Sequence, residues 1–268
     1  MKSSNIWLNI CIALLLPINV IATELSHELD NILQGAHRAP ENIPRDIYRH
    51  PKETLQFFGI KKDMHVLEIL PGKGWYTEIL APLLKNTGQL TVASFGEKNQ
   101  RDYLKNLHIN FMQKMNNDSQ TYSNVKTIVF DDEGYLKAIK ENPIDMVLTF
   151  RNTHNWIRYG GIEDIYKAFY RVLKKGGILG VVQHRAKTGA DHKISAEQGY
   201  VPETYLITLI ENTGFTLLEK STINNNPKDS KNHPKGVWSL APNFLAGEKD
   251  KYLPIGESDR MTLKFVKK

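Results

Sequence analysis

The sequence predicts an α/β protein with a mostly parallel sheet, and three observations support this. Strand-like and helix-like segments alternate regularly from Pro51 to the end of the chain. The run over residues 66–75, VLEILPGKGW, is an apolar strand with one acid, followed by a glycine-bearing turn and a helical pattern. Residues 144–150 are apolar on both faces, as expected of an interior parallel strand.

The first half of the pattern alternates helix and strand. Pro51 suits a first helical turn, and Gly59 ends that helix. Four apolar residues share one face of the next helix, and Gly88 follows it. The apolar residues of the third helix recur at steps of three and four, which is typical of core packing. The predicted elements are a helix over 51–58, a strand over 66–70, a helix over 76–84, a strand over 89–95 and a helix over 99–115.

The second half continues the alternation. The helix after the fourth strand is clearly amphipathic. We expect Lys174–Gly177 to close it, because glycine takes the left-handed cap and lysines complement the helix dipole. Gly214 ends the last helix. The predicted elements are strands over 125–130 and 144–150, a helix over 162–173, a strand over 178–183, a helix over 202–212 and strands over 215–221 and 261–266.

A long insertion, residues 222–260, separates the last two strands. It is rich in Asn, Lys, Asp and Pro. Segments of this length between two elements are usually functional or disordered. Four apolar residues could anchor it and favour an ordered lid: Trp238, Leu240, Phe244 and Leu245.

The first 22 residues resemble a secretory signal. Lys2 precedes an apolar stretch over residues 6–21, and small or slim residues lie before Thr23. This predicts cleavage after Ala22 and export, with the periplasm as the expected compartment. The alternative is an uncleaved membrane anchor. However, the stretch is interrupted by polar residues and a proline and is shorter than the roughly 20 apolar residues of a spanning helix, so we expect no stable anchor after cleavage.

Composition and charge limit the possible functions. Removing 22 of the 268 residues leaves 246, enough for one large domain over residues 51–268 behind an N-terminal arm over residues 23–50. The formal net charge is +6, and the basic residues are scattered, which favours a solvated surface over nucleic-acid binding. The single cysteine, Cys11, lies in the predicted signal. Nothing in the sequence indicates an oligomeric state.

The strand, turn and helix start at residues 66–75 indicate a small-molecule enzyme. A strand, a glycine turn and a helix N-terminus place backbone N–H groups where part of a nucleotide-like ligand can approach closely.

The order of elements resembles class I S-adenosylmethionine-dependent methyltransferases. The features are the acid-bearing glycine turn after the first strand, an Asp after the third and LKKGG before the fifth. More narrowly, the chain resembles an exported group of predicted methyltransferases, through the motifs LPGKGWYTE, FRNTHNW, NPKD and GESDRM. The resemblance covers about residues 51–268. It implies a doubly wound, Rossmann-like, seven-stranded sheet with a reversed last hairpin and S-adenosylmethionine as cofactor.

The resemblance also implies roles for individual residues. Glu68 and the turn 71–74 would face the methionine part of the cofactor, Asp131 the adenine amine, and residues 151–156 the transferred methyl group. Two family features are missing, since Leu70 replaces the first glycine and the acid after the second strand is replaced by Ser94-Phe95-Gly96. Glu97 could substitute for that acid. The predicted cofactor-binding residues are Glu68, Pro71, Gly72, Gly74, Ser94, Asp131 and Arg151.

Candidates for catalysis and for acceptor binding follow the fourth and fifth strands. His154 is the candidate general base, because it lies at the carboxyl edge of the sheet where ligands bind; the alternative is a loop histidine bonded to backbone. Asn152 is grouped with it, although Asn and Thr here could simply cap a helical turn. Trp156 could stack on a planar or cationic acceptor. The predicted acceptor-binding residues are Asn155, Trp156, His184 and Arg185.

Several arginines lie in irregular segments, where they could clamp carboxylates or phosphates or form salt bridges. They are Arg38, Arg45, Arg151, Arg185 and Arg260.

The sequence thus predicts a methyltransferase acting on a small molecule, with S-adenosylmethionine as cofactor and no metal. Two alternatives stay open. One is an exported, non-catalytic ligand-binding module on the same fold. The other is a metal-assisted hydrolase that uses loop histidines and acids, although the chain has no HExxH motif or similarly spaced ligand set.

Overall fold

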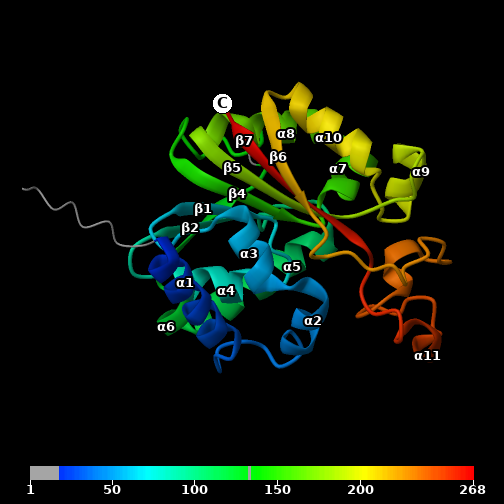
Figure 1. The fold of residues 1–268 in the computed structure, drawn as a ribbon, viewed down its shortest axis with the longest axis horizontal. Coiled ribbons are helices and arrows are strands. Elements are labelled where there is room, and N and C mark those ends of the chain that lie inside the picture. Colours follow the sequence, from blue (N-terminus) through cyan, green and yellow to red (C-terminus); the bar gives the residue numbers. More distant parts are fainter. Residues whose placement is uncertain (1–17, 132–133) are drawn as a thin grey trace, which may run out of the picture.

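A computed structural model describes residues 18–131 and 134–268, and its centre is one seven-stranded sheet (Figure 1). The strand order is β3-β2-β1-β4-β5-β7-β6. Neighbouring strands pair in parallel except that β7 is antiparallel to both β5 and β6. The predicted doubly wound sheet with a reversed last hairpin is confirmed. The strands are β1 (His65–Ile69), β2 (Gln89–Ser94), β3 (Val125–Val129), β4 (Ile144–Phe150), β5 (Leu173–His184), β6 (Phe215–Ser221) and β7 (Arg260–Lys267).

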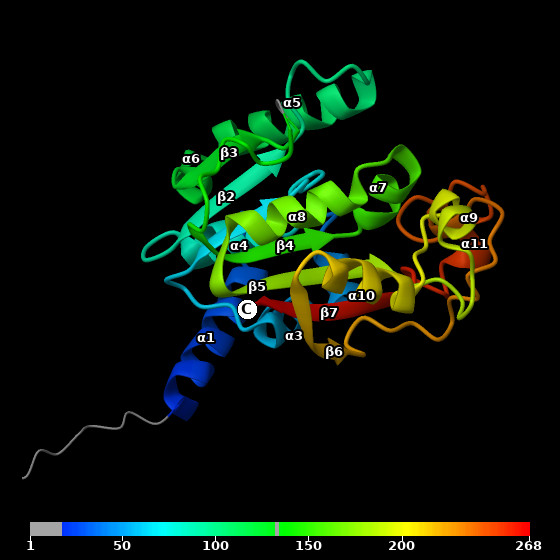
Figure 2. The ribbon, with the colours of Figure 1, turned by 90° about the horizontal axis from the view of Figure 1, so that it is seen from above.

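Helices cover both faces of the sheet (Figure 2). Residues of α1, α3, α4 and α5 form one apolar core, and residues of α8 and α10 form the core on the opposite face. The helices are α1 (Ile18–Leu33), α2 (Asp46–Arg49), α3 (Pro51–Phe58), α4 (Thr77–Leu84), α5 (Asp102–Asn117), α6 (Ser119–Tyr122), α7 (Thr153–Tyr159), α8 (Ile162–Val172), α9 (His192–Glu197), α10 (Glu203–Asn212) and α11 (Lys249–Tyr252), with 3-10 turns η1 (Ile43–Arg45) and η2 (Gly236–Ser239).

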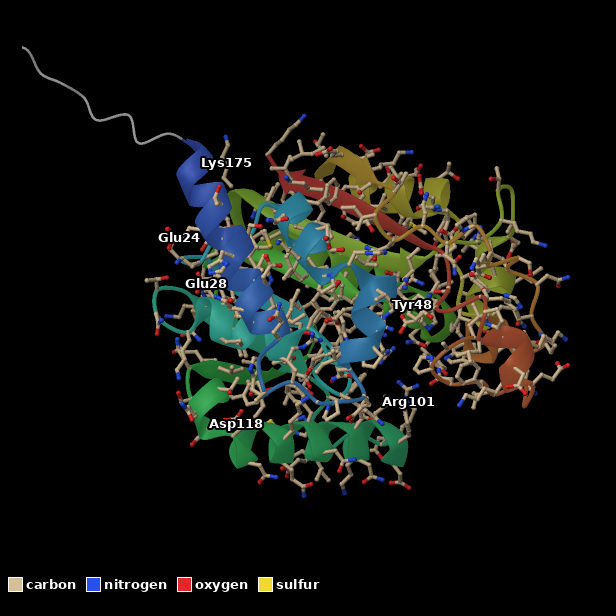
Figure 3. The ribbon with its side chains drawn as sticks, turned by 60° about the horizontal axis from the view of Figure 1, so that its bottom comes forward. Glu24, Glu28, Tyr48, Arg101, Asp118 and Lys175 are labelled. Atoms are coloured by element: carbon tan, nitrogen blue, oxygen red, sulfur yellow. The ribbon has the colours of Figure 1, made fainter. Side chains whose placement is uncertain are left out.

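The predicted signal peptide lies mostly outside the described residues, which begin at Ile18. Helix α1 therefore starts before the predicted cleavage point after Ala22. Glu24 and Glu28 lie one turn apart on α1 (Figure 3), and the ammonium of Lys62 pairs with both carboxylates at 2.8 and 2.9 Å. In the described part of the chain, no helix combines the length and the apolar character that crossing a bilayer requires.

The helix end expected at Lys174–Gly177 was wrong. Helix α8 ends at Val172, and Leu173 already has extended dihedrals and begins β5. Strand β5 pairs with β4 at Leu173 and again at Ile178, so the four residues between them form an irregularity inside the strand. Gly176 does take a left-handed conformation there, with φ +76°. The sequence correctly predicted a left-handed glycine here, but pairing with β4 places this glycine inside a strand instead of at a helix end.

Candidate active site

A large cavity lies at the carboxyl ends of β1 and β4 and has a volume of about 940 Å³. These two strands are the switch point of the sheet, because the chain continues from β1 towards β2 and from β4 towards β5 on opposite sides. Ligands of open α/β sheets bind at such a point. Eight of the predicted site residues line the cavity: Glu68, Pro71, Gly72, Arg151, Asn152, His154, Asn155 and His184.

The turn after β1 presents bare backbone to this cavity. Gly72 has φ +63°, and a Cβ placed on it would meet no atom within 4 Å. No described residue accepts a hydrogen bond from the backbone N–H of Gly72 or Lys73. Gly74 differs, because a Cβ there would lie 3.0 Å from the ring of Phe111. Gly72 therefore leaves room for a ligand, whereas Gly74 allows α5 to pack closely against the turn.

Both strand ends at the switch point carry a non-glycine residue in the left-handed region. Leu70 follows β1 with φ +48°, and Arg151 follows β4 with φ +64°. The backbone N–H of Leu70 donates to Ala93 at 2.8 Å, and that of Arg151 donates to Val182 at 2.7 Å. Such conformations are costly for residues with side chains and cluster at functional sites. Here neighbouring strands hold them in place.

Glu68 is a buried acid at the base of the cavity, with 1% of its surface exposed. Its Oε2 accepts a hydrogen bond of 2.7 Å from the hydroxyl of Thr77. Burial raises the pKa of Glu68 to about 7, against the lowering effects of this bond and of Lys114. The carboxyl group is therefore poised to change charge near neutral pH.

Asn152 joins the two strand ends instead of capping α7. Its Nδ2 donates to the carbonyl of Ile69 at 2.9 Å and to the hydroxyl of Thr149 at 3.3 Å. No side-chain cap bond forms at the start of α7. Asn152 thus links the ends of β1 and β4 at the switch point. Sequence periodicity did not predict helix α7.

His154 is buried, and its Nδ1 accepts a hydrogen bond of 3.3 Å from Nε2 of Gln183, which also donates to Gly199 O at 3.2 Å. In a neutral imidazole this arrangement places the proton on Nε2. Burial lowers the pKa of His154 to about 4. A base with so low a pKa is inefficient at neutral pH, so the arrangement favours a hydrogen-bond donor over the predicted general base.

His184 is the last residue of β5 and Arg185 follows it, but the two side chains have different surroundings. His184 lines the cavity, and its Nδ1 lies 2.5 Å from the hydroxyl of Ser258. Burial lowers the pKa of His184 well below its usual value. Arg185 does not line the cavity and pairs with Glu203 at 2.9 Å and Asp259 at 3.3 Å. This is the salt-bridge role that sequence analysis left open for the arginines.

Besides Gly74 and Arg185, three predicted residues lie outside the cavity. Ser94 is buried, and its hydroxyl is 3.1 Å from Nδ1 of His108. Asp131 is exposed, beyond the end of β3. Trp156 packs in the core, its ring centroid 6.1 Å from that of Phe130. In this structure the indole contacts core aromatic rings, which does not support stacking on an acceptor.

A cluster of charged residues that sequence analysis largely missed lies beside the cavity. The carboxylate of Glu257 pairs with Arg45 at 2.7 Å, Arg49 at 2.9 Å and Arg260 at 3.1 Å. These arginines lower the pKa of Glu257 below its usual range, although burial acts in the opposite direction. Arg49 carried no local signal, and Glu257 was marked only as part of the GESDRM motif. Their pairing could not be predicted, because the partners lie more than 200 positions apart.

Asp229 holds the insertion 222–260 against the sheet edge. The acid is buried and accepts hydrogen bonds from the hydroxyl of Tyr200 at 3.0 Å, Nε2 of His233 at 2.8 Å and the backbone N–H of Asp259 at 2.9 Å. The NPKD and GESDRM motifs therefore meet here. The insertion also contributes Val237, Trp238 and residues 241–243 to the cavity wall.

Replacing Asp229 with asparagine should loosen this segment. The variant loses a carboxylate that four donors share, the three above and the backbone N–H of Lys231 at 2.9 Å. This loss costs about 1–3 kcal/mol of stability. We expect a protease to cleave the variant faster than the wild type between residues 230 and 252. Mass spectrometry of the fragments measures this rate. Asp250→Asn is the control, because Asp250 is exposed in the same segment. Equal cleavage rates in the two variants would contradict the anchoring role.

Metal ligands do not converge in the part of the chain that the structure describes. No group of three or more His, Cys, Asp and Glu side chains there is arranged to hold an ion. The hydrolase alternative therefore has no structural support.

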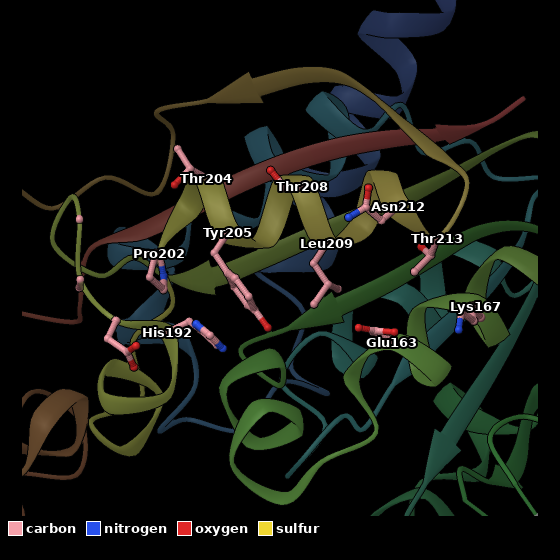
Figure 4. Close-up of a pocket in the computed structure, with 13 residues that line it drawn as sticks. Glu163, Lys167, His192, Pro202, Thr204, Tyr205, Thr208, Leu209, Asn212 and Thr213 are labelled. Atoms are coloured by element: carbon pink, nitrogen blue, oxygen red, sulfur yellow. The ribbon is translucent and has the colours of Figure 1, made fainter.

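A second cavity, of about 830 Å³, lies between α8 and α10 (Figure 4). Its wall includes Glu163 and Lys167 from α8 and Tyr205 and Thr208 from α10. The ring of Tyr205 stacks on His192 with centroids 4.0 Å apart. None of the predicted site residues lines this cavity, and it belongs to the helical layer instead of the strand ends. We therefore place the candidate active site at β1 and β4.

The strand order and the reversed hairpin define the fold of class I methyltransferases. Among solved structures, a SAM-dependent methyltransferase from Aquifex aeolicus matches with TM-score 0.54 and 15% identity, covering 74% of this chain and 93% of that chain. The [4+2]-cyclase SpnF matches with TM-score 0.57 and 15% identity, covering 91% and 93%. An arsenic(III) S-adenosylmethionine methyltransferase from Chlamydomonas reinhardtii matches with TM-score 0.53 and 13% identity, covering 90% and 73%.

Comparisons of the sequence with protein-family models and with curated proteins gave no match. At these identities the structural matches establish a shared fold, and the activity has to be argued from the site.

Proposed function

We propose that this protein is an S-adenosylmethionine-dependent methyltransferase acting on a small-molecule acceptor. The observation that carries the proposal is the open turn at Gly72, which lines a cavity of about 940 Å³ at the switch point of the sheet and in which the backbone N–H groups of Gly72 and Lys73 donate to no residue that the structure describes. The volume lies within the range of cofactor sites. Solved structures with this fold include proteins named as S-adenosylmethionine methyltransferases, which supports the assignment.

The residues present fit the methionine half of the cofactor. The N–H groups of Gly72 and Lys73 would hold its polar end, and Glu68 in its ionised form would face its positive charge. When bound, the cofactor supplies a methyl group already activated by a sulfonium centre. The protein then has to bind and align the acceptor, exclude water and accept or hold a proton.

The acceptor would lie beyond β4. Asn155 and His184 line this side of the cavity. His154, with its proton on Nε2, would donate a hydrogen bond to an acceptor oxygen or nitrogen and orient it. Glu68, whose pKa is about 7, is better matched than His154 to proton transfer at neutral pH.

The adenosine half fits less well. Ser94 and Asp131, expected to contact the ribose and the adenine, lie outside the cavity. The cavity extends instead along α5, where Tyr103, Leu107 and Phe111 line it. The acid expected directly after β2 to hold the ribose hydroxyls is absent, and Glu97, the possible substitute, is exposed and does not line the cavity. A charge-assisted contact of that kind is worth about 1.5–3 kcal/mol.

The missing acid favours a second candidate function, a binding module that keeps the fold without transferring methyl groups. Solved structures with this fold include one named as a [4+2]-cyclase, so the fold itself does not determine the reaction. Tight binding of an adenosyl ligand without turnover would support this candidate.

We also propose that the mature chain is exported, on the basis of the N-terminal sequence alone.

Calorimetry with S-adenosylmethionine and S-adenosylhomocysteine tests the cofactor assignment. The decisive variant is Gly72→Asn, because asparagine tolerates a left-handed backbone but places a side chain where the ligand would lie. We expect its affinity for both ligands to fall at least tenfold, with an unchanged melting temperature.

The matched control is Gly176→Asn, since Gly176 also has a left-handed φ of +76° and no atom within 4 Å of its Cβ position, but lies in β5 away from the cavity. Its affinity should equal that of the wild type. Wild-type binding by Gly72→Asn would refute the proposed use of the turn.

A further inference from the structure

The cavity has an excess of positive charge on one side. Arg45, Arg49 and Arg260 share the carboxylate of Glu257, the one acid within ion-pair distance of them among the described residues. Arg151 lines the same cavity, and its guanidinium has neither an ion pair nor a hydrogen bond to any described residue. Three guanidinium groups therefore share a single carboxylate, and a fourth, that of Arg151, has no anionic partner among the described residues.

Arg49 shows the consequence most directly. The residue is 2% exposed, and its Nε donates to Glu257, but no described residue accepts a hydrogen bond from its buried Nη1 and Nη2. The guanidinium lies over the ring of Trp75, 4.7 Å from its centroid, which fixes its plane. Buried donors without acceptors are costly. The guanidinium of Arg49 thus has a fixed orientation, and two of its nitrogen atoms lack an acceptor among the described residues.

Electrostatic effects agree with the geometry. Burial lowers the pKa of Arg49 to about 10 and that of Arg151 well below its usual value, and the neighbouring arginines lower both further. An added anion would relieve this repulsion and supply the missing acceptors.

We infer that the acceptor substrate carries an anionic group, a carboxylate or a phosphate, which binds between Arg49 and Arg151. This inference rests on the proposed methyltransferase function and names its substrate class. Arginine suits the role, because its planar fork matches carboxylate and phosphate oxygens.

The topology assigns this anion to the acceptor and not to the cofactor. The open turn and Glu68 belong to β1, towards β2, where the cofactor is expected. Arg151 follows β4 and Arg260 begins β7, and both of these strands lie on the other side of β1 from β2. His184 and Ser258, next to this cluster, also come from the β5 and β7 side. An anion held there would place the rest of the acceptor towards the switch point.

The test measures anion binding to the whole protein by calorimetry, with inorganic phosphate and succinate as probes and sodium chloride at matched ionic strength as the reference. The wild type should bind at least one probe. Arg151→Gln should weaken that binding at least tenfold, and Arg49→Gln should do the same. Arg101→Met is the control, because Arg101 is exposed and lies outside the cavity; its affinity should not change.

A second measurement separates the two sources of the anion. S-adenosylhomocysteine carries an amino-acid carboxylate, and 5′-methylthioadenosine lacks it. The ratio of their affinities should be the same in the wild type and in Arg151→Gln. A selective loss of S-adenosylhomocysteine affinity in the variant would assign the arginines to the cofactor and overturn the inference.

Absence of phosphate and succinate binding to the wild type would also overturn the inferred anion site. Phosphate binding without any adenosyl binding would support the anion site while refuting the methyltransferase function.

Discussion

Replacing Glu257 with glutamine is expected to reduce the free energy of unfolding by about 3–5 kcal/mol at pH 7, because removing one partner of a buried ionic cluster leaves the others uncompensated. Glu257 is 4% exposed and is the shared partner of Arg45, Arg49 and Arg260. Glutamine keeps the size of the side chain but offers one neutral acceptor to three cations. Urea denaturation followed by circular dichroism measures the loss.

The control for this variant is Glu248→Gln, because the carboxylate of Glu248 is half exposed and pairs with an exposed lysine. Its stability should change by less than about 0.5 kcal/mol. Phosphate at tens of millimolar should restore part of the stability of Glu257→Gln by binding the freed arginines. A loss below about 1 kcal/mol would mean that the arginines are adequately hydrated without Glu257.

Lowering the pH should also destabilise the wild type, because it protonates the same carboxylate. The folded pKa of Glu257 is depressed, so its stabilising effect is complete above the ordinary carboxyl pKa of 4.5 and is lost as the pH falls towards the folded value. Glu257→Gln should lack this part of the acid-induced loss, and its stability should approach that of the wild type at low pH.

The sheet could be predicted from the sequence because its signals are local. Apolar runs of five to seven residues define the inner strands, and glycines mark where the chain turns. The turn at Gly72 is a feature of this kind, since its conformation and its position after β1 both follow from adjacent residues. The order of strands came from resemblance, and pairing confirms it.

The arginine cluster could not be predicted in the same way. Its contacts join the N-terminal segment to the start of β7, and only the folded sheet edge brings them together. The sequence marked Arg45 and Arg260 as arginines in irregular segments and Glu257 as part of the GESDRM motif, but it gave no signal for Arg49 or for the pairing of these residues. Gln183 was missed for the same reason, because its position in β5 is typical of a strand and only its contact with His154 makes it informative.

Replacing Glu68 with glutamine should stabilise the protein above pH 7 by about 3 kcal/mol, the free energy that corresponds to raising a carboxyl pKa from 4.5 to about 7. The folded state keeps the proton of Glu68 up to about pH 7, whereas the unfolded chain loses it near 4.5. Folding therefore takes up a proton between these values, and the wild type loses stability as the pH rises through this window. Glutamine cannot ionise and still accepts the hydrogen bond from Thr77.

Urea denaturation of both proteins at pH 4, 6 and 8 measures this difference. The two stabilities should coincide near pH 4 and separate progressively up to pH 8. Glu97→Gln is the control, since Glu97 is exposed, and its curve should follow that of the wild type. Parallel curves for Glu68→Gln and the wild type would show that Glu68 ionises with an ordinary pKa.

Ligand binding should depend on pH in the opposite direction. A cofactor with a positive charge binds better when Glu68 is ionised, so the affinity of the wild type for S-adenosylmethionine should rise from pH 6 to pH 8, by up to about tenfold for a group with a pKa near 7. Glu68→Gln should bind weakly at both values with no such rise. A residue that lowers stability as it ionises and raises affinity in the same pH range is maintained for binding and not for folding.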